Sequence, residues 1–158
     1  MADVPYNDDP DAVTPLPGVA DALDRARRAG LKVGIVTNQR GVALGRISPE
    51  RLEAVHARVE ALLGPFDVVA WCPHDVFDRC RCRKPGPGLI LHAAAQLGVP
   101  VGSCLVVGDS WTDIVAAHNA GAMALLVGDG PAPSGSGVTR VSDLAAAVEL
   151  ALGRWVAA

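Results

Sequence analysis

Aromatic residues are scarce in this sequence, which also has no run of basic residues and no long apolar segment. Phe, Trp and Tyr make up only 4% of its 158 residues although 50% are hydrophobic, so Ala, Val and Leu must build the core. Because the formal net charge is −3, we expect no binding to nucleic acid. The apolar runs are too short to cross a bilayer and no signal peptide opens the chain, so we expect a soluble, cytoplasmic protein without a membrane partner.

The length suits one domain, and strand-like and helix-like segments alternate along it. Short apolar runs predict buried strands over residues 31–36, 66–71, 104–107 and 122–127. Helices are predicted from Pro17 to Gly30, from Ser48 onward, over 89–97, from 112 or 113 to 121, and over 143–152 with Ser142 as the cap. Residues 37–41 and 128–137 are predicted loops. The alternation predicts an α/β fold: one domain over residues 1–158, with a doubly wound parallel sheet and helices on both faces.

One short loop, residues 72–88, concentrates three of the four cysteines and one of the four histidines. Clustered cysteines in an intracellular chain indicate metal binding rather than disulfides. Cys72, His74, Cys80 and Cys82 make a Cys₃His set, which holds Zn²⁺ tetrahedrally and leaves no open position. The spacing therefore predicts a structural zinc site in a loop that has few apolar residues of its own. The alternative is a group of surface thiols that bind no metal.

Polar residues follow two of the predicted strands, at the edge where parallel sheets bind their ligands. Asp109 comes just after one strand, and its carboxylate suits Mg²⁺, with Asp113 as a ligand or a support for the loop. Thr37 and Asn38 come after another strand and can donate hydrogen bonds to phosphate oxygens. Ordinary local roles are the alternatives, because an aspartate can cap the next helix and Thr-Asn can form a turn.

Two adjacent cations, Arg83 and Lys84, stand before a Pro-Gly-Pro-Gly run and a predicted helix. Arginine binds phosphate in a bidentate manner and lysine acts as a point charge, so the pair is a candidate anion clamp. The alternative is a solvated basic turn. Each of these motifs is weak alone, and their order along the chain carries the interpretation.

That order resembles the haloacid dehalogenase (HAD) superfamily of aspartate-nucleophile phosphatases. Within it, the chain is similar to the zinc-containing group that includes heptose bisphosphate phosphatases and histidinol-phosphatase domains. The matching segments are PLPGV (15–19), TNQRG (37–41), CPH to CRCRKPGPG (72–88) and VGDSWTD (107–113). The resemblance spans roughly residues 3 to 130, and the cysteine loop followed directly by Arg-Lys-Pro is its most specific part.

The resemblance implies a role for each candidate residue. Thr37 would hydrogen-bond the transferring phosphoryl group, and Lys84 would neutralise its charge. Asp109 would bind Mg²⁺ with support from Asp113. The implied substrate-binding residues are Asn38, Gln39, Arg40, Arg83, Lys84 and Ser110. Ser110 stands where the heptose enzymes often carry lysine, so the resemblance argues less strongly for the same substrate than for the same family.

The nucleophile of that family is missing from this sequence. It lies in an Asp-x-Asp-Gly-Thr motif after the first, central strand, and Met1 falls about where the residue after that motif would be. Four early aspartates, Asp3, Asp8, Asp9 and Asp11, do not replace it, because no apolar strand precedes them and a nucleophile needs rigid placement. We therefore expect a sheet without its first central strand and a chain that, as given, does not hydrolyse phosphate esters.

Three interpretations remain open. The favoured one is a phosphatase for a small phosphorylated metabolite, such as a sugar (heptose) bisphosphate, whose given sequence starts at an internal methionine. The second is an inactive, zinc-stabilised module that binds a phosphorylated ligand or a partner. The third is a fragment completed by a strand from another chain. We expect a monomer that uses catalytic Mg²⁺ and structural Zn²⁺.

Overall fold

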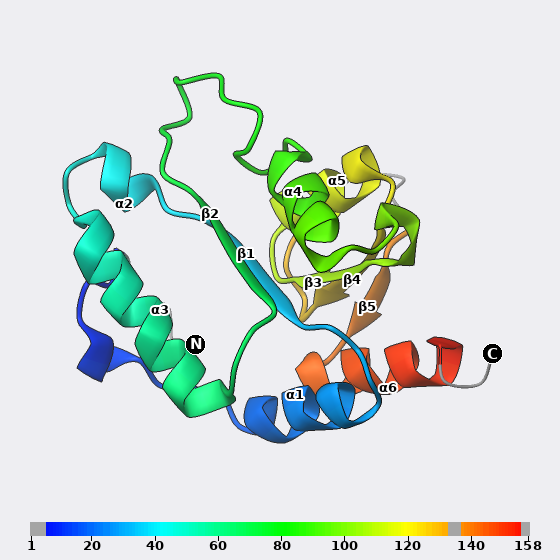
Figure 1. Cartoon of the computed structure of the whole chain (residues 1–158). Helices are drawn as coiled ribbons and strands as arrows, with labels where there is room; N and C mark the ends of the chain where they lie inside the picture. The colour runs from blue at the N-terminus through cyan, green and yellow to red at the C-terminus, as the bar shows by residue number, and fades with distance from the viewer. Residues whose placement is uncertain (1–5, 133–136, 156–158) are drawn as a thin grey trace.

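The computed structural model describes residues 6–132 and 137–155, in which strands and helices alternate (Figure 1). The strands are β1 (Gly34–Asn38), β2 (Val68–Cys72), β3 (Leu105–Gly108), β4 (Met123–Val127) and β5 (Thr139–Val141). The α-helices are α1 (Val19–Arg28), α2 (Arg40–Ala43), α3 (Pro49–Leu63), α4 (Gly88–Leu97), α5 (Trp111–Ala120) and α6 (Leu144–Trp155). Two short 3₁₀-helices, η1 (Pro10–Ala12) and η2 (Val101–Ser103), complete the described elements.

The strands form two parallel sheets instead of one. β1 pairs with β2, while β3, β4 and β5 form the second sheet in that order. Among the described residues β1 and β3 do not pair with each other, and each pairs with a strand on its outer side only. The predicted parallel α/β fold is confirmed, and the break between β1 and β3 agrees with the absence of one central strand.

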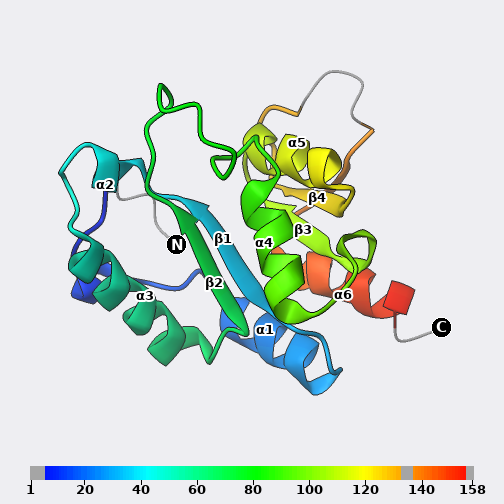
Figure 2. The same cartoon turned by 45° about the horizontal axis from the view of Figure 1, so that its top comes forward.

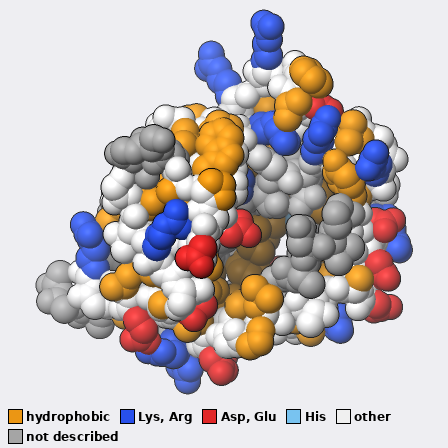
Figure 3. All heavy atoms as spheres, turned by 180° about the vertical axis from the view of Figure 1, so that it is seen from behind, with side chains coloured by type: hydrophobic (Ala, Val, Ile, Leu, Met, Phe, Trp, Pro, Cys, Tyr) orange, Lys and Arg blue, Asp and Glu red, His pale blue; other side chains and the backbone are white. Residues whose placement is uncertain are grey.

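Burial follows this break. β2 lies at an outer edge, but its residues Val68, Ala70 and Cys72 are buried. No residue of β1 or β3 is buried, although these strands lie at the centre of the strand order. In an intact doubly wound sheet the central strands are the most enclosed, because both faces and both edges are covered. The molecule is also visibly hollowed on the face opposite to that of Figure 1, with hydrophobic side chains on the floor of the hollow (Figure 3).

Helices on both faces hold the two sheets together. On one face, α4 and α5 pack through Ile90 and Ala117, and this cluster takes in Val36 from β1 and Val106 from β3. On the other, α1 and α6 pack on each other through Ala22, Ala26 and Val148 and are joined by the ion pair of Arg25 with Glu149. Figure 2 shows α4 lying over the interval between β1 and β3. Each helical layer therefore spans the break in the sheet.

The predicted strand positions are shifted toward the carboxyl ends. The strand predicted over 31–36 is wrong in its bounds, because Leu31 and Val33 pack into the α1–α6 cluster and the ladder begins at Gly34. The ladder pairs Thr37 with Trp71 and Asn38 with Cys72, so both polar residues belong to β1. Ladder hydrogen bonds come from the backbone, and a polar side chain does not end them.

Three further boundaries differ from prediction. The loop predicted over 37–41 contains the first two residues of α2, and the segment after 137 forms β5 instead of continuing as loop. Helix α5 begins at Trp111, since Ser110 caps it. The cap of α6 is Asp143, whose Oδ1 accepts from the Ala146 amide at 2.9 Å, and not Ser142, whose hydroxyl donates to Asp143.

Candidate functional site

The cysteine loop folds so that its four predicted metal ligands meet. The ligand atoms of Cys72, His74, Cys80 and Cys82 all lie within 4.8 Å of one another. The Sγ atom of Cys82 is 3.2 Å from that of Cys72, 3.5 Å from that of Cys80 and 3.3 Å from Nδ1 of His74. Cys72 Sγ lies 3.6 Å from Cys80 Sγ and 3.5 Å from His74 Nδ1. These spacings are the edges of a small tetrahedron.

The tetrahedron is close to the size that zinc requires. With Zn–S bonds of about 2.3 Å and a Zn–N bond of about 2.0 Å, tetrahedral geometry puts neighbouring ligand atoms roughly 3.5–3.8 Å apart. Burial and the hydrogen bond with Cys82 raise the pKa of the Cys72 thiol to about 12. Burial also opposes ionisation of Cys80, but hydrogen bonds from the Arg83 amide and from the neighbouring thiols outweigh it and lower its pKa. Charged thiolates crowded this closely need a cation between them, so the donor set fits a metal ion.

Other side chains fix the ends of the loop. The Arg83 guanidinium donates to the His74 carbonyl at 3.1 Å, and the Arg83 amide donates to Cys80 Sγ at 3.4 Å. Arg40 Nε pairs with Asp75 Oδ2 at 3.1 Å, which ties α2 to the loop and holds the pKa of Asp75 below its usual value against the effect of burial. Neither arginine projects free of partners, so both hold the loop in shape.

Two glycines let the end of the loop fold back on itself. A Cβ atom on Gly86 or Gly88 would collide with the Arg81 carbonyl. The Gly88 amide donates to that same carbonyl at 3.1 Å, and α4 begins there. The Pro-Gly-Pro-Gly run therefore sets the direction in which Lys84, a few residues earlier, faces the sheet.

Lys84 is the residue that joins the two sheets. Its Nζ donates to the Val36 carbonyl of β1 at 2.9 Å and lies 2.5 Å from Oδ1 of Asp113, in α5. The two charged side chains are only 12% and 10% exposed. An ammonium group has three donors, so one remains after these two contacts and can meet a ligand oxygen. Because Asp113 follows β3, the carboxyl ends of β1 and β3 open at the same edge.

Both ends of the Asn38 amide bond the backbone of Lys84. Its Oδ1 accepts from the Lys84 amide at 3.0 Å, and its Nδ2 donates to the Lys84 carbonyl at 3.1 Å. Gln39 Nε2 donates to Thr37 Oγ1 at 3.2 Å, which leaves the hydroxyl proton of Thr37 available. Asn38 therefore positions Lys84, while Thr37 keeps a donor for a ligand.

The segment after β3 is built around a capping box. Ser110 Oγ accepts from the Thr112 amide at 3.2 Å, and Oδ2 of Asp113 accepts from the Ser110 amide at 3.3 Å. A Cβ atom on Gly108 would collide with the Asp113 side chain, so only glycine fits at that position. Asp109, between Gly108 and Ser110 in the sequence, is exposed and its side chain has no partner among the described residues. Its carboxylate is the free acidic group at this edge.

The structure brings Thr37, Asn38, Lys84 and Asp113 together and places Asp109 beside them. The alternative of a helix cap holds for Asp113, which caps α5 and also pairs with Lys84. Sequence reasoning missed the Val36 carbonyl, because a valine side chain gives no hint that its backbone binds a cation. It also missed Asp75, whose partner Arg40 lies 35 residues away along the chain.

Two of the early aspartates, Asp9 and Asp11, belong to η1 and not to this edge. Asp9 caps η1 and Asp11 lies within it, and η1 packs against α3 instead of leading into a sheet. Asp3 lies outside the described residues. Across the described ranges, no helix has the length and apolarity needed to cross a membrane.

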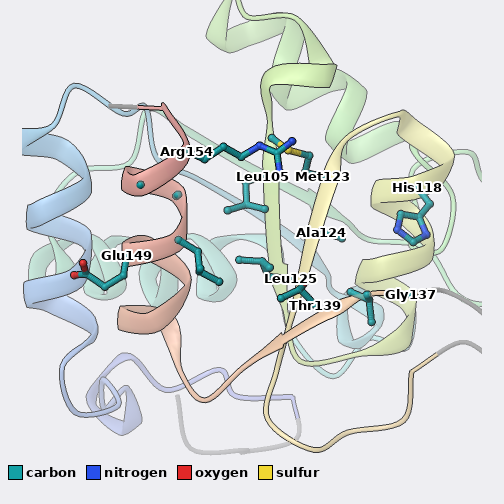
Figure 4. A pocket seen from close by; sticks show the side chains of 13 residues that line it. Leu105, His118, Met123, Ala124, Leu125, Gly137, Thr139, Glu149 and Arg154 are labelled. Carbon is teal, nitrogen blue, oxygen red and sulfur yellow. The ribbon is translucent and has the colours of Figure 1, made fainter. Parts of the chain in front are cut away.

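A cavity of about 590 Å³ lies elsewhere, where α6 faces β3, β4 and β5 (Figure 4). Its walls are mainly apolar, with Leu105, Met123 and Leu125 among them. The charged residues do not converge, since His118 and Glu149 lie on opposite sides of it. It contains none of the predicted site residues, so the polar edge at Lys84 is the candidate site.

Comparisons with known proteins agree with this geometry. The family model of haloacid dehalogenase-like hydrolases matches residues 4–121. Two proteins named D-glycero-β-D-manno-heptose-1,7-bisphosphate 7-phosphatase are similar to this chain in sequence. The one from Pseudomonas aeruginosa is 36% identical over 150 residues, which cover 87% of this chain and 83% of that protein. The other, from Pseudomonas putida, is 38% identical over 120 residues, covering 73% and 69%.

A solved structure extends the likeness to three dimensions. The D,D-heptose 1,7-bisphosphate phosphatase from B. bronchiseptica, complexed with magnesium and phosphate, superposes with a TM-score of 0.83 at 34% identity. The match covers 92% of this chain and 88% of that one. The chain belongs to the haloacid dehalogenase-like hydrolase family.

Proposed function

We propose that the edge around Lys84 is the phosphoryl-binding site of a HAD-type phosphatase that acts on a small sugar bisphosphate of the heptose class. The observation that carries the proposal is the Lys84 ammonium, which is nearly buried between the Val36 carbonyl of β1 and Asp113 of α5 and has one donor left. Buried cations of this kind stabilise the charge that spreads over phosphoryl oxygens in transfer reactions. The names of the similar proteins support the choice of heptose 1,7-bisphosphate as substrate.

The residues at this edge have different roles in binding the phosphoryl group. Thr37 donates its hydroxyl to one phosphoryl oxygen and Lys84 donates to another, while Asn38 and Asp113 keep Lys84 in place. Asp109 would hold Mg²⁺, which usually takes one or two carboxylates and completes its shell with phosphate oxygens and water. When bound, that ion supplies positive charge to the phosphoryl oxygens.

The Cys₃His cluster has a structural role in this proposal. Zn²⁺ in a closed four-ligand site offers no open position for chemistry. It would fix the loop from which Arg83 and Lys84 extend, one and two residues beyond the last ligand, Cys82. Arg83, Arg40 and Gln39 then shape the surroundings of the substrate through their contacts with the loop and with Thr37.

A second candidate function is binding without hydrolysis. It is favoured by one observation: among the described residues, no aspartate follows a strand between β1 and β3, where an in-line carboxylate nucleophile would have to stand. Phosphate monoesters are extremely unreactive without such a group. The phosphoryl-binding half of the site is independent of that carboxylate.

Two measurements on the chain test the proposal together. Isothermal titration with D-glycero-β-D-manno-heptose 1,7-bisphosphate and Mg²⁺ should give saturable binding that is lost in Lys84→Met and kept in Lys32→Met, a matched control whose ammonium bonds the Leu97 carbonyl. Phosphate release measured in the same samples separates the two functions. Release that depends on Lys84 supports the phosphatase, and binding without release supports the second candidate. Equal titration curves for the two lysine variants would show that Lys84 is not part of the binding site.

A further inference from the structure

The three thiols of the cysteine cluster lie within reach of one another. The Sγ atom of Cys82 is 3.2 Å from that of Cys72 and 3.5 Å from that of Cys80, and the Sγ atoms of Cys72 and Cys80 are 3.6 Å apart. Because a disulfide bond is about 2.05 Å long, the sulfurs of Cys72 and Cys82 have to approach by only about 1.2 Å to form one. The arrangement that fits zinc therefore also fits a disulfide.

Access from solvent differs among these thiols. Cys72 is the last residue of β2 and is fully buried, while Cys80 and Cys82 are partly exposed. A dissolved oxidant therefore meets Cys80 or Cys82 first, and Cys72 reacts only with a partner that is already inside the cluster. The fourth cysteine, Cys104, lies outside the cluster, where its thiol bonds the Pro100 carbonyl. It serves as an internal control.

Cys72 and Cys82 stand at the two ends of the base of the loop. Asn38 pairs with Cys72 in the β1–β2 ladder, and its side-chain amide bonds the backbone of Lys84, two residues beyond Cys82. These contacts keep the two ends together without the thiols. A disulfide between Cys72 and Cys82 would therefore tie the loop to β2, whereas one between Cys80 and Cys82 would join the loop only to itself.

We infer that Cys72 and Cys82 are a redox pair, and that their disulfide replaces zinc as the cross-link of the loop when the chain meets a peroxide. The inference rests on the structural role proposed for zinc and goes beyond it. Joining these two sulfurs leaves only two of the four metal ligands, His74 and Cys80, so zinc is released. The base of the loop stays closed, while the two remaining ligands become free.

The oxidation by hydrogen peroxide consists of two displacement steps. The Cys82 thiolate attacks one peroxide oxygen, the O–O bond breaks, and hydroxide leaves behind a sulfenic acid on Cys82. The Cys72 thiolate then attacks the Cys82 sulfur, the S–O bond breaks, and a second hydroxide leaves. Two protons from the solvent convert the hydroxides to water. One peroxide is thus reduced by two electrons while the two thiolates are oxidised to one disulfide.

Peptide mapping of the zinc-loaded chain shows which pair forms. Trypsin cleaves after Arg79, Arg81 and Arg83, so it puts each cysteine of the cluster in a separate peptide. The peptides of Cys80 and Cys82 are both Cys-Arg, and Arg81→Lys, at an exposed side chain, makes their masses different.

The expected product is specific. After treatment with hydrogen peroxide and blocking of the free thiols, we expect the Cys72 peptide to be joined to the Cys82 peptide, and Cys80 and Cys104 to be blocked as free thiols. Cys104→Ser should behave as the parent does, and Cys80→Ser should still form the same link.

Zinc release and stability test the exchange of one cross-link for the other. A metal indicator in the same samples should record about one zinc released for each disulfide formed, and dithiothreitol with added zinc should reverse both changes. The oxidised chain should unfold at a higher urea concentration than the reduced chain stripped of zinc by a chelator, because only the oxidised chain keeps a closed loop.

Several results would overturn the inference: a link that joins Cys80 or Cys104, zinc that stays bound after oxidation, or an oxidised chain no more stable than the reduced metal-free one. A chain that holds no zinc before peroxide is added would contradict both the structural role of zinc and the exchange. No phosphate enters these measurements, so their failure leaves phosphoryl binding at Lys84 untouched and is distinguishable from failure of that proposal.

Discussion

The ion pair of Lys84 with Asp113 should be a principal link between the two halves of the molecule. Its atoms are 2.5 Å apart, and both side chains are almost excluded from water. Removing one member of such a pair leaves a charge without its partner, which typically costs about 3–5 kcal/mol. In Lys84→Met the Asp113 carboxylate keeps the Ser110 amide as a partner, so we expect a loss of about 3 kcal/mol in the free energy of unfolding.

A double-mutant cycle isolates the pair from its surroundings. Asp113→Asn removes the charge but keeps an oxygen for the capping box, and the double variant Lys84→Met/Asp113→Asn leaves no charge to compensate. The double variant should therefore lose less than the sum of the single losses, with a coupling energy of about 2 kcal/mol. Urea unfolding followed by tryptophan fluorescence gives all four free energies, provided that the slope with urea is the same in each.

The matched control is Lys32→Met, which removes the bond to the Leu97 carbonyl at an exposed site and should cost no more than about 1 kcal/mol. A coupling energy below about 0.5 kcal/mol would refute the reasoning, because residues with no energetic contact add within that limit.

Three other perturbations probe other parts of the structure. Purified without chelator, the chain should carry about one zinc by elemental analysis, and Cys80→Ser should carry clearly less; equal zinc contents would count against the cluster. Gly108→Ala should lower the urea midpoint by pushing the new methyl group into Asp113, whereas Gly102→Ala, where the nearest atom is 3.9 Å away, should not; equal midpoints would contradict that packing. Hydrogen bonds from the Ala146 amide and the Ser142 hydroxyl lower the pKa of Asp143, so its contribution to stability is full above the usual carboxyl pKa and disappears as pH falls through the lowered value. Asp143→Asn should therefore match the parent midpoint near neutral pH, because asparagine also caps, and lose less than the parent between pH 5 and pH 2; parallel losses would argue against the cap.

Much of the architecture was predictable because local patterns determine it. Ser48 followed by Pro49 marks the start of α3, and Gly98 and Gly121 end α4 and α5 in the left-handed region. The metal cluster was predictable for the same reason, since four ligand residues lie within eleven positions. Strand bounds were less predictable, because the ladder extends through Thr37 and Asn38 by backbone bonds that are insensitive to side-chain polarity.

The contacts that organise the site depend on tertiary structure. Asn38 was predicted to bind substrate, and the partner that holds its amide in the structure is the backbone of Lys84, 46 residues along the chain. Asp113 was predicted to support Asp109, and the structure gives it a further partner, Lys84, that the sequence did not indicate. In both cases the sequence predicted that a polar side chain lies at the site. It did not predict the partner of that side chain, because the partner depends on how α4 and α5 pack across the break.

The most direct test of phosphoryl binding uses the fact that the chain has only two lysines, Lys32 and Lys84. With isotope-labelled lysine, the two side chains give two separate NMR signals, which variants of each lysine assign. Titration with the sugar bisphosphate and Mg²⁺ should shift the Lys84 signal along a saturating curve and leave Lys32 in place. A Lys84 signal that stays fixed, or one that moves only as far as that of Lys32, would contradict the proposed site.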